Sequence, residues 1–148
     1  MGTSAKNLFT KEEKQQIVNA IKEAELNTSG EIRVHIENNC PGDVLERAVF
    51  LFGKMGIHQT EQRNGVLFYL AVKSRKFAIV GDEGINKVVP DDFWEKIKIR
   101  MAHHFQQGDF AIGLIRGILD AGEALKKYFP YQSDDVNELS DEISFGKN

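Results

Sequence analysis

The sequence predicts an α/β domain built on a small mixed sheet, and two observations support this. Residues 31–37, 44–55 and 66–72 have the patterns of a strand, a helix and a strand, which in that order form a βαβ unit with parallel strands. Residues 77–80 are apolar and follow a polar Lys-Ser-Arg-Lys turn, so we expect them to return antiparallel to the strand before them. Helical patterns lie on both sides of these strands in the sequence.

The composition is that of one globular domain. The chain has 148 residues, 41% of them hydrophobic and 28% charged, which is enough for a single sizeable core. Its net charge of −3 is uneven: five acidic residues and one lysine give residues 131–148 a net of −4, which leaves about +1 for the rest. A near-neutral body argues against nucleic-acid binding. We therefore predict a flexible N-terminus (1–9), a domain (10–130) and an acidic, mobile or loosely docked tail (131–148).

The sequence predicts no insertion into a membrane. No segment has the ~20 apolar residues that a membrane helix needs, and the first residues lack the hydrophobic segment of a signal peptide. The lone Cys40 cannot form an internal disulfide, which fits a reducing compartment. We therefore expect a cytoplasmic location, while the sequence leaves open whether a leader has been removed.

The first half of the chain is expected to contain two helices around a strand. A first helix is predicted from Lys11 to Leu26, because Thr10 and Glu13 have capping-box spacing and apolar residues recur at helical spacing after them. Residues 31–37 alternate between polar and apolar, which predicts one buried face and a position towards the sheet edge. Asp43 is expected to cap the second helix. The predicted apolar stripe of that helix is Val44, Leu45, Ala48, Val49, Leu51, Phe52 and Met55.

The second half is expected to contain the buried hairpin and two longer helices. Residues 66–72 are continuously apolar, which predicts a strand buried on both faces. The Gly81 to Gly84 segment follows the next strand without opening a helix directly. Asp91 is the predicted N-cap of a third helix, with apolar residues 94, 97, 101 and 105 on its buried face. A fourth helix is expected over residues 110–127, where glycines at 113 and 117 permit close backbone approach.

The predicted pairing gathers oxygen-bearing side chains at one rim of the sheet. Parallel strands start at the same edge, and an antiparallel partner ends beside them. The side chains brought together in this way are Ser29, Glu31, Glu61, Asn64, Asp82, Glu83, Asp91 and Asp92. Ca²⁺ takes about six to eight oxygen ligands from such groups. The candidate ligands for Ca²⁺ or Mg²⁺ are therefore Glu31, Asn64, Asp82, Glu83, Asp91 and Asp92.

A simpler interpretation of the same residues also stands. Asp91 can serve only as a helix cap, and Asp82 and Glu83 can simply belong to a turn. No EF-hand or other tight ligand spacing supports the metal site.

Other kinds of site find little support in the sequence. The four histidines do not have zinc-ligand spacing. Cys40 and Arg47 are separated by six residues where a cysteine-phosphatase loop has five, and Asp43 would repel a phosphate there. No phosphate-binding, nucleophile-elbow or dinucleotide-binding motif occurs. The sequence thus offers oxygen ligands but no obvious activated nucleophile, and catalytic residues stay unknown.

Four motifs in order resemble the TPM domain family. They are Thr-Ser-Gly-Glu-Ile-Arg-Val at 28–34, Arg-Asn-Gly-Val-Leu at 63–67, Gly-Asp-Glu-Gly-Ile at 81–85, and Phe-Gln-Gln-Gly-Asp-Phe at 105–110 with Gly-Leu at 113–114. The resemblance covers about residues 10–130. It implies a three-layer α/β/α sandwich with helices on both faces of a small mixed sheet. It also implies divalent-cation binding, often of Ca²⁺, at the loop rim, and a phosphatase activity assigned from a plant thylakoid member.

The resemblance can be followed residue by residue. The family's Asn-Gly loop falls on Asn64, its glycine loop on 81–84, and its following acidic position on Asp91 or Asp92. Many members carry Asp where this chain has Arg63, which removes one carboxylate from the rim and places a positive charge near it. Many members are also membrane-anchored or exported. This chain shows neither feature and looks like the short soluble bacterial branch.

Three functions remain open at this point. The first is a non-catalytic or regulatory interaction module, in which Ca²⁺ or Mg²⁺ orders the rim loops for a protein partner that could be membrane-associated. The second is a metal-dependent acid phosphatase acting on phosphate monoesters, with Asp82 or Asp91 holding the cation and Arg63 neutralising charge. The third is an adaptor without metal that uses the acidic tail. We rank the first above the second, because it requires no nucleophile.

Overall fold

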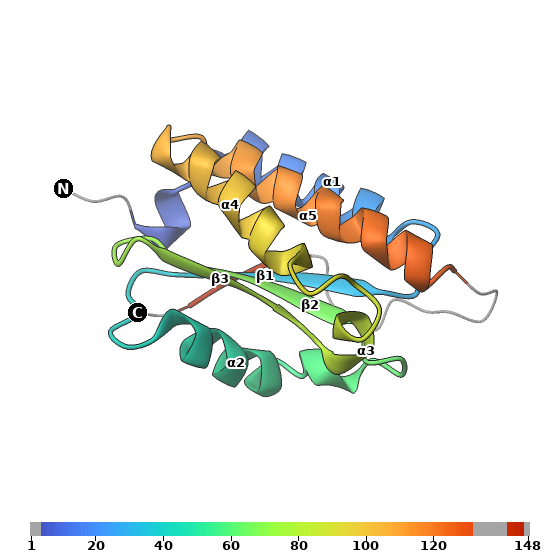
Figure 1. Ribbon diagram of the computed structural model, residues 1–148. Helices are drawn as coiled ribbons and strands as arrows, with labels where there is room; N and C mark the ends of the chain where they lie inside the picture. The colour runs from blue at the N-terminus through green and yellow to red at the C-terminus, as the bar shows by residue number, and fades with distance from the viewer. Residues whose placement is uncertain (1–3, 132–141, 147–148) are drawn as a thin grey trace.

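The computed structural model describes residues 4–131 and 142–146, and it has three layers (Figure 1). Helices α1, α4 and α5 cover one face of a four-stranded sheet, and α2 covers the other. The helices are η1 (Ala5–Asn7), α1 (Lys11–Glu25), α2 (Val44–Lys54), η2 (Ile57–Gln59), α3 (Glu83–Asn86), α4 (Phe93–Gln106) and α5 (Phe110–Tyr128). The strands are β1 (Glu31–Glu37), β2 (Gly65–Ala71), β3 (Lys76–Gly81) and β4 (Ile143–Phe145). The mixed α/β/α sandwich is confirmed.

The strand pairing follows the predicted pattern. The sheet order is β3-β2-β1-β4, with β1 parallel to β2 from the Glu31–Gly65 pair onwards. Strand β3 runs antiparallel to β2, so that Gly81 at its end pairs with Val66 near the start of β2. Every residue of β2 is buried, as expected for a central strand. The starts of β1 and β2 therefore lie beside the end of β3.

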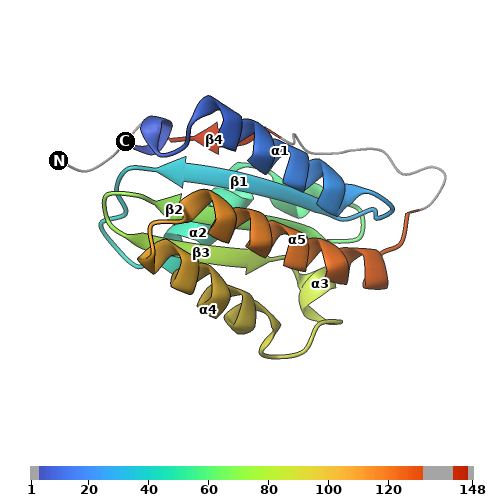
Figure 2. The same ribbon diagram turned by 90° about the horizontal axis from the view of Figure 1, so that it is seen from above.

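The prediction that β1 lies towards the sheet edge is wrong. Strand β1 lies between β2 and β4, and its polar residues Glu31, His35 and Glu37 are buried. The reason is that residues 143–145, in a segment expected to be loosely docked, pair in parallel with Val34–Ile36. Figure 2 shows β4 beside β1 and beneath α1. The greater part of the predicted acidic tail, residues 132–141 and 147–148, lies outside the described residues.

Two predicted helix starts need correction. A short helix, α3, does follow β3 directly, because the Asp82 side chain accepts a hydrogen bond from the Glu83 N–H (2.7 Å) and caps it. The N-cap of α4 is Asp92 rather than Asp91, and it makes no side-chain capping bond. The Pro90 carbonyl instead accepts from the Phe93 N–H (3.0 Å), so a turn precedes the helix.

The helix layer on one face packs through small residues. A Cβ at Gly117 would lie 2.5 Å from the Met101 sulfur, and a Cβ at Gly122 would lie 2.6 Å from the Ala24 Cβ. These contacts bring α4 and α1 against α5 above the larger of two cores, which confirms the close approach predicted at Gly117. The capping box of α1 is also confirmed, since Thr10 and Glu13 exchange both of its hydrogen bonds.

The segment before α1 packs on the domain. Ala5 and Phe9 are buried, and the Ala5 N–H donates to the Asn38 side chain (2.6 Å). No helix in the described ranges is both long and apolar enough to cross a membrane, and the predicted cytoplasmic location stays a prediction.

Candidate cation site at the sheet rim

Two loops cross at the rim where β1 and β2 start. The Gly84 N–H donates to the Arg63 carbonyl (2.8 Å), and the Asp82 N–H donates to the Gly65 carbonyl (3.0 Å). A Cβ at Gly84 would lie 2.1 Å from the Gln62 carbonyl oxygen, so only glycine permits this approach. The segment before β2 and the segment after β3 are thus held together by backbone bonds.

Arg63 binds both carboxylates of the crossing loops. Its Nε and Nη2 donate to the two oxygens of Asp82 (2.8 and 2.9 Å), and its Nη1 donates to Glu83 (3.2 Å). Asp82 is only 6% exposed, while the Arg63 side chain is 43% exposed. The hydrogen bond to Asp82 raises the pKa of Arg63. A positive charge therefore already lies where the sequence predicts a cation.

Asn64 links the starts of β1 and β2, as the predicted rim requires. Its Nδ2 donates to the Ser29 hydroxyl oxygen (3.1 Å), and its backbone N–H donates to the Thr60 hydroxyl oxygen (3.1 Å). The residue is 1% exposed, and its Oδ1 has no hydrogen-bond partner in the described structure. Glu31, the buried first residue of β1, is paired in register with Gly65 beside it. Glu31, Asn64, Asp82 and Glu83 therefore share this rim.

The other two predicted ligands belong to a different segment. Asp91 and Asp92 are exposed in the turn before α4, and Asp92 pairs with Lys96 (3.3 Å). No hydrogen bond or ion pair in residues 4–131 joins either of them to Asp82 or Glu83. Throughout residues 4–131 and 142–146, no three His, Cys, Asp or Glu side chains lie close enough together to hold a metal ion.

The rim donors still fit a hard divalent cation on one condition. Carboxylate oxygens from Asp82 and Glu83, the amide oxygen of Asn64 and nearby backbone carbonyls are the ligand types that Ca²⁺ and Mg²⁺ take. Arg63 occupies both Asp82 oxygens, so its guanidinium would have to withdraw first. The donor types thus fit a divalent cation, provided that Arg63 releases Asp82.

Comparison with known proteins identifies the family. Residues 3–124 match the family model of the TPM domain. The chain belongs to the TPM domain family. No curated protein matches it.

Three solved structures are similar to this TPM domain. The BA42 protein of the psychrophilic bacterium Bizionia argentinensis is 49% identical, with a TM-score of 0.86 over 93% of this chain and 95% of that one. An N-terminal domain from P. gingivalis is 20% identical, with a TM-score of 0.70 over 84% and 83% of the two chains. The N-terminal domain of the cg2496 protein from Corynebacterium glutamicum is 15% identical, with a TM-score of 0.65 over 88% and 81%. The last two show likeness in fold alone.

A second polar cluster of the TPM domain lies at the other end of β1. Glu37 is 2% exposed and accepts hydrogen bonds from Arg47 of α2 and from the Tyr69 hydroxyl of β2. His35 Nδ1 lies 2.9 Å from the Ser144 hydroxyl of β4, and its Nε2 lies 3.6 Å from Glu37. This cluster is not predicted from the sequence, in which the polar alternation of β1 is its one visible sign.

Burial and hydrogen bonds in this second cluster shift its proton affinities. Burial lowers the pKa of His35, with Glu37 opposing. Burial also acts to raise the pKa of Glu37, but hydrogen bonds from Arg47 and Tyr69 outweigh it and lower that pKa. Burial raises the pKa of Tyr69. A neutral His35 beside an ionised Glu37 therefore lies between the sheet and α2.

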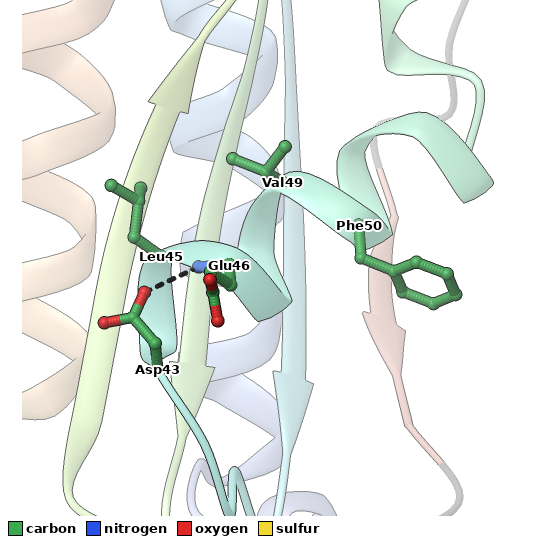
Figure 3. A pocket seen from close by; sticks show the side chains of 5 residues that line it. All are labelled: Asp43, Leu45, Glu46, Val49 and Phe50. Carbon is green, nitrogen blue, oxygen red and sulfur yellow. Dashed lines mark hydrogen bonds between the residues drawn. The ribbon is translucent and has the colours of Figure 1, made fainter.

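Helix α2 of the TPM domain also exposes an apolar surface (Figure 3). Leu45, Val49 and Phe50 are each more than half exposed, and with Asp43 and Glu46 they line a shallow pocket, which we call the α2 surface. The predicted apolar stripe of α2 is therefore only partly buried, with Ala48, Leu51 and Phe52 against the sheet. Val44 and Met55 are half-buried against the smaller core, whereas Leu45 and Val49 of the predicted stripe face outwards.

Proposed function

We propose that this TPM domain is a non-catalytic interaction module that binds Ca²⁺ or Mg²⁺ at the rim, with the crossing loops becoming ordered for a protein partner. The buried amide oxygen of Asn64, which lacks a partner in the described structure, supports this most directly. Leaving such a group unpaired costs free energy, which a bound cation or a water would recover. The neighbouring loops carry the Asp82 and Glu83 carboxylates.

Asp82, Glu83 and Asn64 are the proposed ligands, with backbone carbonyls of the crossing loops beside them. Glu31 would join only through a rearrangement, because it does not lie close enough to Asp82 and Glu83 to hold an ion with them. A bound cation supplies positive charge to these oxygens and so favours one loop arrangement. Asp91 and Asp92 would join only through a rearrangement of the turn before α4, because they contact neither Asp82 nor Glu83.

Rim chemistry favours binding over catalysis. The Ser29 hydroxyl accepts from Asn64, and no histidine of the described residues bonds to it, so no histidine is placed to activate it. The alternative of a metal-dependent phosphatase acting on phosphate monoesters has one observation in its favour: the half-exposed Arg63 guanidinium could also contact a phosphate oxygen. Turnover of aryl phosphates that requires added metal and is lost in Asp82→Asn would favour that alternative.

The α2 surface is the proposed contact for the protein partner. It is connected to the rim, since α2 leads through η2 to the crossing loops and a Cβ at Gly65 would lie 2.6 Å from the Ile57 carbonyl oxygen. Asp43 and Glu46 border its apolar residues. Arg47 and Lys54 lie over the Phe50 ring. We therefore expect a partner whose apolar face carries basic residues opposite Asp43 and Glu46 and acidic residues beside Phe50, either free or bound to a membrane.

A titration of the metal-stripped protein with Ca²⁺ and with Mg²⁺ tests this function. Calorimetry should give saturable binding, and ¹⁵N amide shifts should concentrate at residues 29–31, 60–65 and 81–84. Amide exchange of the crossing loops should slow when the ion is bound. Asp82→Asn should weaken binding. The matched control Asp120→Asn should not, because it removes a carboxylate of α5 that pairs with Arg100 of α4. No saturable binding below about 1 mM would contradict the proposal.

A further inference from the structure

We propose that Arg63 is an internal competitor of the divalent cation, so that its guanidinium must leave Asp82 and Glu83 before the ion binds. This inference rests on the proposed function of the rim. Arg63 would therefore control the affinity of the rim for the cation, and its guanidinium would be released when the cation binds.

Arg63 occupies the carboxylates as an ion would. Its planar fork takes both oxygens of Asp82, and one of these also accepts the Glu83 N–H (2.7 Å). With Asp82 only 6% exposed, little of this carboxylate is left for another ligand. A Ca²⁺ ligand oxygen lies about 2.3–2.6 Å from the ion, which leaves no room for the guanidinium on the same oxygens.

The charges of the two states also favour exchange over coexistence. The charges of Arg63, Asp82 and Glu83 sum to −1. The rim therefore still carries one unbalanced negative charge while the guanidinium is bound. A divalent ion on the same carboxylates would make the sum +1 if Arg63 stayed beside it. Two positive charges within a few ångströms repel, so ion binding and release of Arg63 are coupled.

The backbone permits this exchange without undoing the loop crossing. Arg63 has φ = 53°, a left-handed conformation, and its carbonyl is held by the Gly84 N–H (2.8 Å). Its side chain is 43% exposed and can turn into solvent about its own torsions. The main chain of the crossing loops can therefore stay in place while the guanidinium moves.

Calorimetric titration of four metal-stripped proteins with CaCl₂ at low ionic strength tests the inference. They are the wild type, Arg63→Gln, Arg63→Lys and Arg100→Gln. Arg63→Gln removes the charge and the fork, and Arg63→Lys keeps the charge but not the fork. Arg100→Gln is the matched control, because Arg100 of α4 also donates two hydrogen bonds to one carboxylate, that of Asp120 on α5.

Arg63→Gln should bind Ca²⁺ about tenfold more tightly than the wild type, as expected for loss of charge-assisted hydrogen bonds. Arg63→Lys should lie between the two, and Arg100→Gln should match the wild type. In the wild type, the Arg63 Nε–H resonance should exchange slowly with water without metal and broaden as Ca²⁺ saturates the site. Thermal unfolding of each variant confirms that it is folded.

The outcomes separate this inference from the proposed function. Equal affinity in the wild type and Arg63→Gln, or weaker binding in Arg63→Gln, would overturn the competition and leave the metal site standing. Binding only in Arg63→Gln would support the competition and overturn the proposed function for the natural chain. Binding in neither protein would overturn both.

Discussion

The two ends of β1 each carry an arginine on a buried carboxylate, but in different surroundings. At the rim, Arg63 holds Asp82 between two loops, and among residues 4–131 and 142–146 no other side chain bonds to that carboxylate. At the other end, Glu37 is bound by Arg47, by Tyr69 and, more distantly, by His35, from three different elements. A carboxylate with several fixed side-chain partners is hard to release, whereas Asp82, whose one side-chain partner is exposed, can exchange that partner while it keeps the Glu83 N–H. The difference separates a structural cluster from a candidate binding site.

Removing the Glu37 carboxylate should have the largest effect on stability. Glu37→Ala leaves the Arg47 guanidinium and the Tyr69 hydroxyl without their acceptor inside the protein. Breaking a fully buried ion pair costs about 3–5 kcal/mol, and because the Arg47 side chain is 35% exposed we expect the lower end, about 3 kcal/mol. Denaturant unfolding should show this loss, while Glu83→Ala, at the exposed side of the rim, should change little. Similar losses of unfolding free energy in Glu37→Ala and Glu83→Ala would contradict the difference proposed between the two ends of β1.

Forcing the crossing loops apart should have an intermediate effect. A Cβ at Gly84 would lie 2.1 Å from a backbone oxygen, which cannot move as a side chain could. Gly84→Ala should therefore destabilise the protein by about 1–3 kcal/mol and weaken Ca²⁺ binding. Gly42→Ala is the control, because a Cβ there meets nothing within 4 Å. If the two variants unfold alike, the loop crossing contributes little to the rim.

The pH dependence of stability should report the cluster at Glu37. Burial keeps the pKa of His35 below its usual 6.5, so the unfolded chain takes up a proton first as the pH falls. The contribution of His35 is thus present above about pH 6.5 and is lost below it, by up to about 1.4 kcal/mol for each pH unit. Glu37, whose pKa is also lowered, adds a loss of the same sign at more acidic pH.

Denaturant unfolding between pH 7.5 and 5 measures this slope. His35→Gln should flatten it, whereas His58→Gln, at an exposed position, should leave it as in the wild type. Equal slopes in the wild type and His35→Gln would show that His35 does not sense pH.

Local patterns predicted the features whose causes are local. Thr10 and Glu13 predict the start of α1, and the continuous run of apolar residues predicts β2. Because strand order and direction follow from these elements, the meeting of Asn64 with Ser29 at the rim could also be predicted.

Features that depend on distant partners could not be predicted. The polar face of β1 resembles a solvated edge until Arg47 and Ser144 supply buried partners for it. A strand of three residues, β4, has no periodicity of its own. The paired hydrogen bonds from Arg63 to Asp82 depend on a left-handed backbone at Arg63. The sequence does not predict that backbone, because the position holds neither glycine nor asparagine. For Asp91 and Asp92, the turn at Pro90 sets the helix start, and their place among the ligands stays a prediction.

The β4 strand has a consequence for the order in which the sheet opens. His35 and Ser144 are separated by 109 positions in the sequence, yet β4 pairs with only three residues of β1, and its own residues are half-buried. Such a strand should detach in small fluctuations that leave the other three strands intact. The Gly146 amide, which donates to Ile36 (2.8 Å), should therefore exchange its hydrogen long before the amides of β2 do. Each such excursion would briefly open the outer edge of β1 to a strand from another molecule.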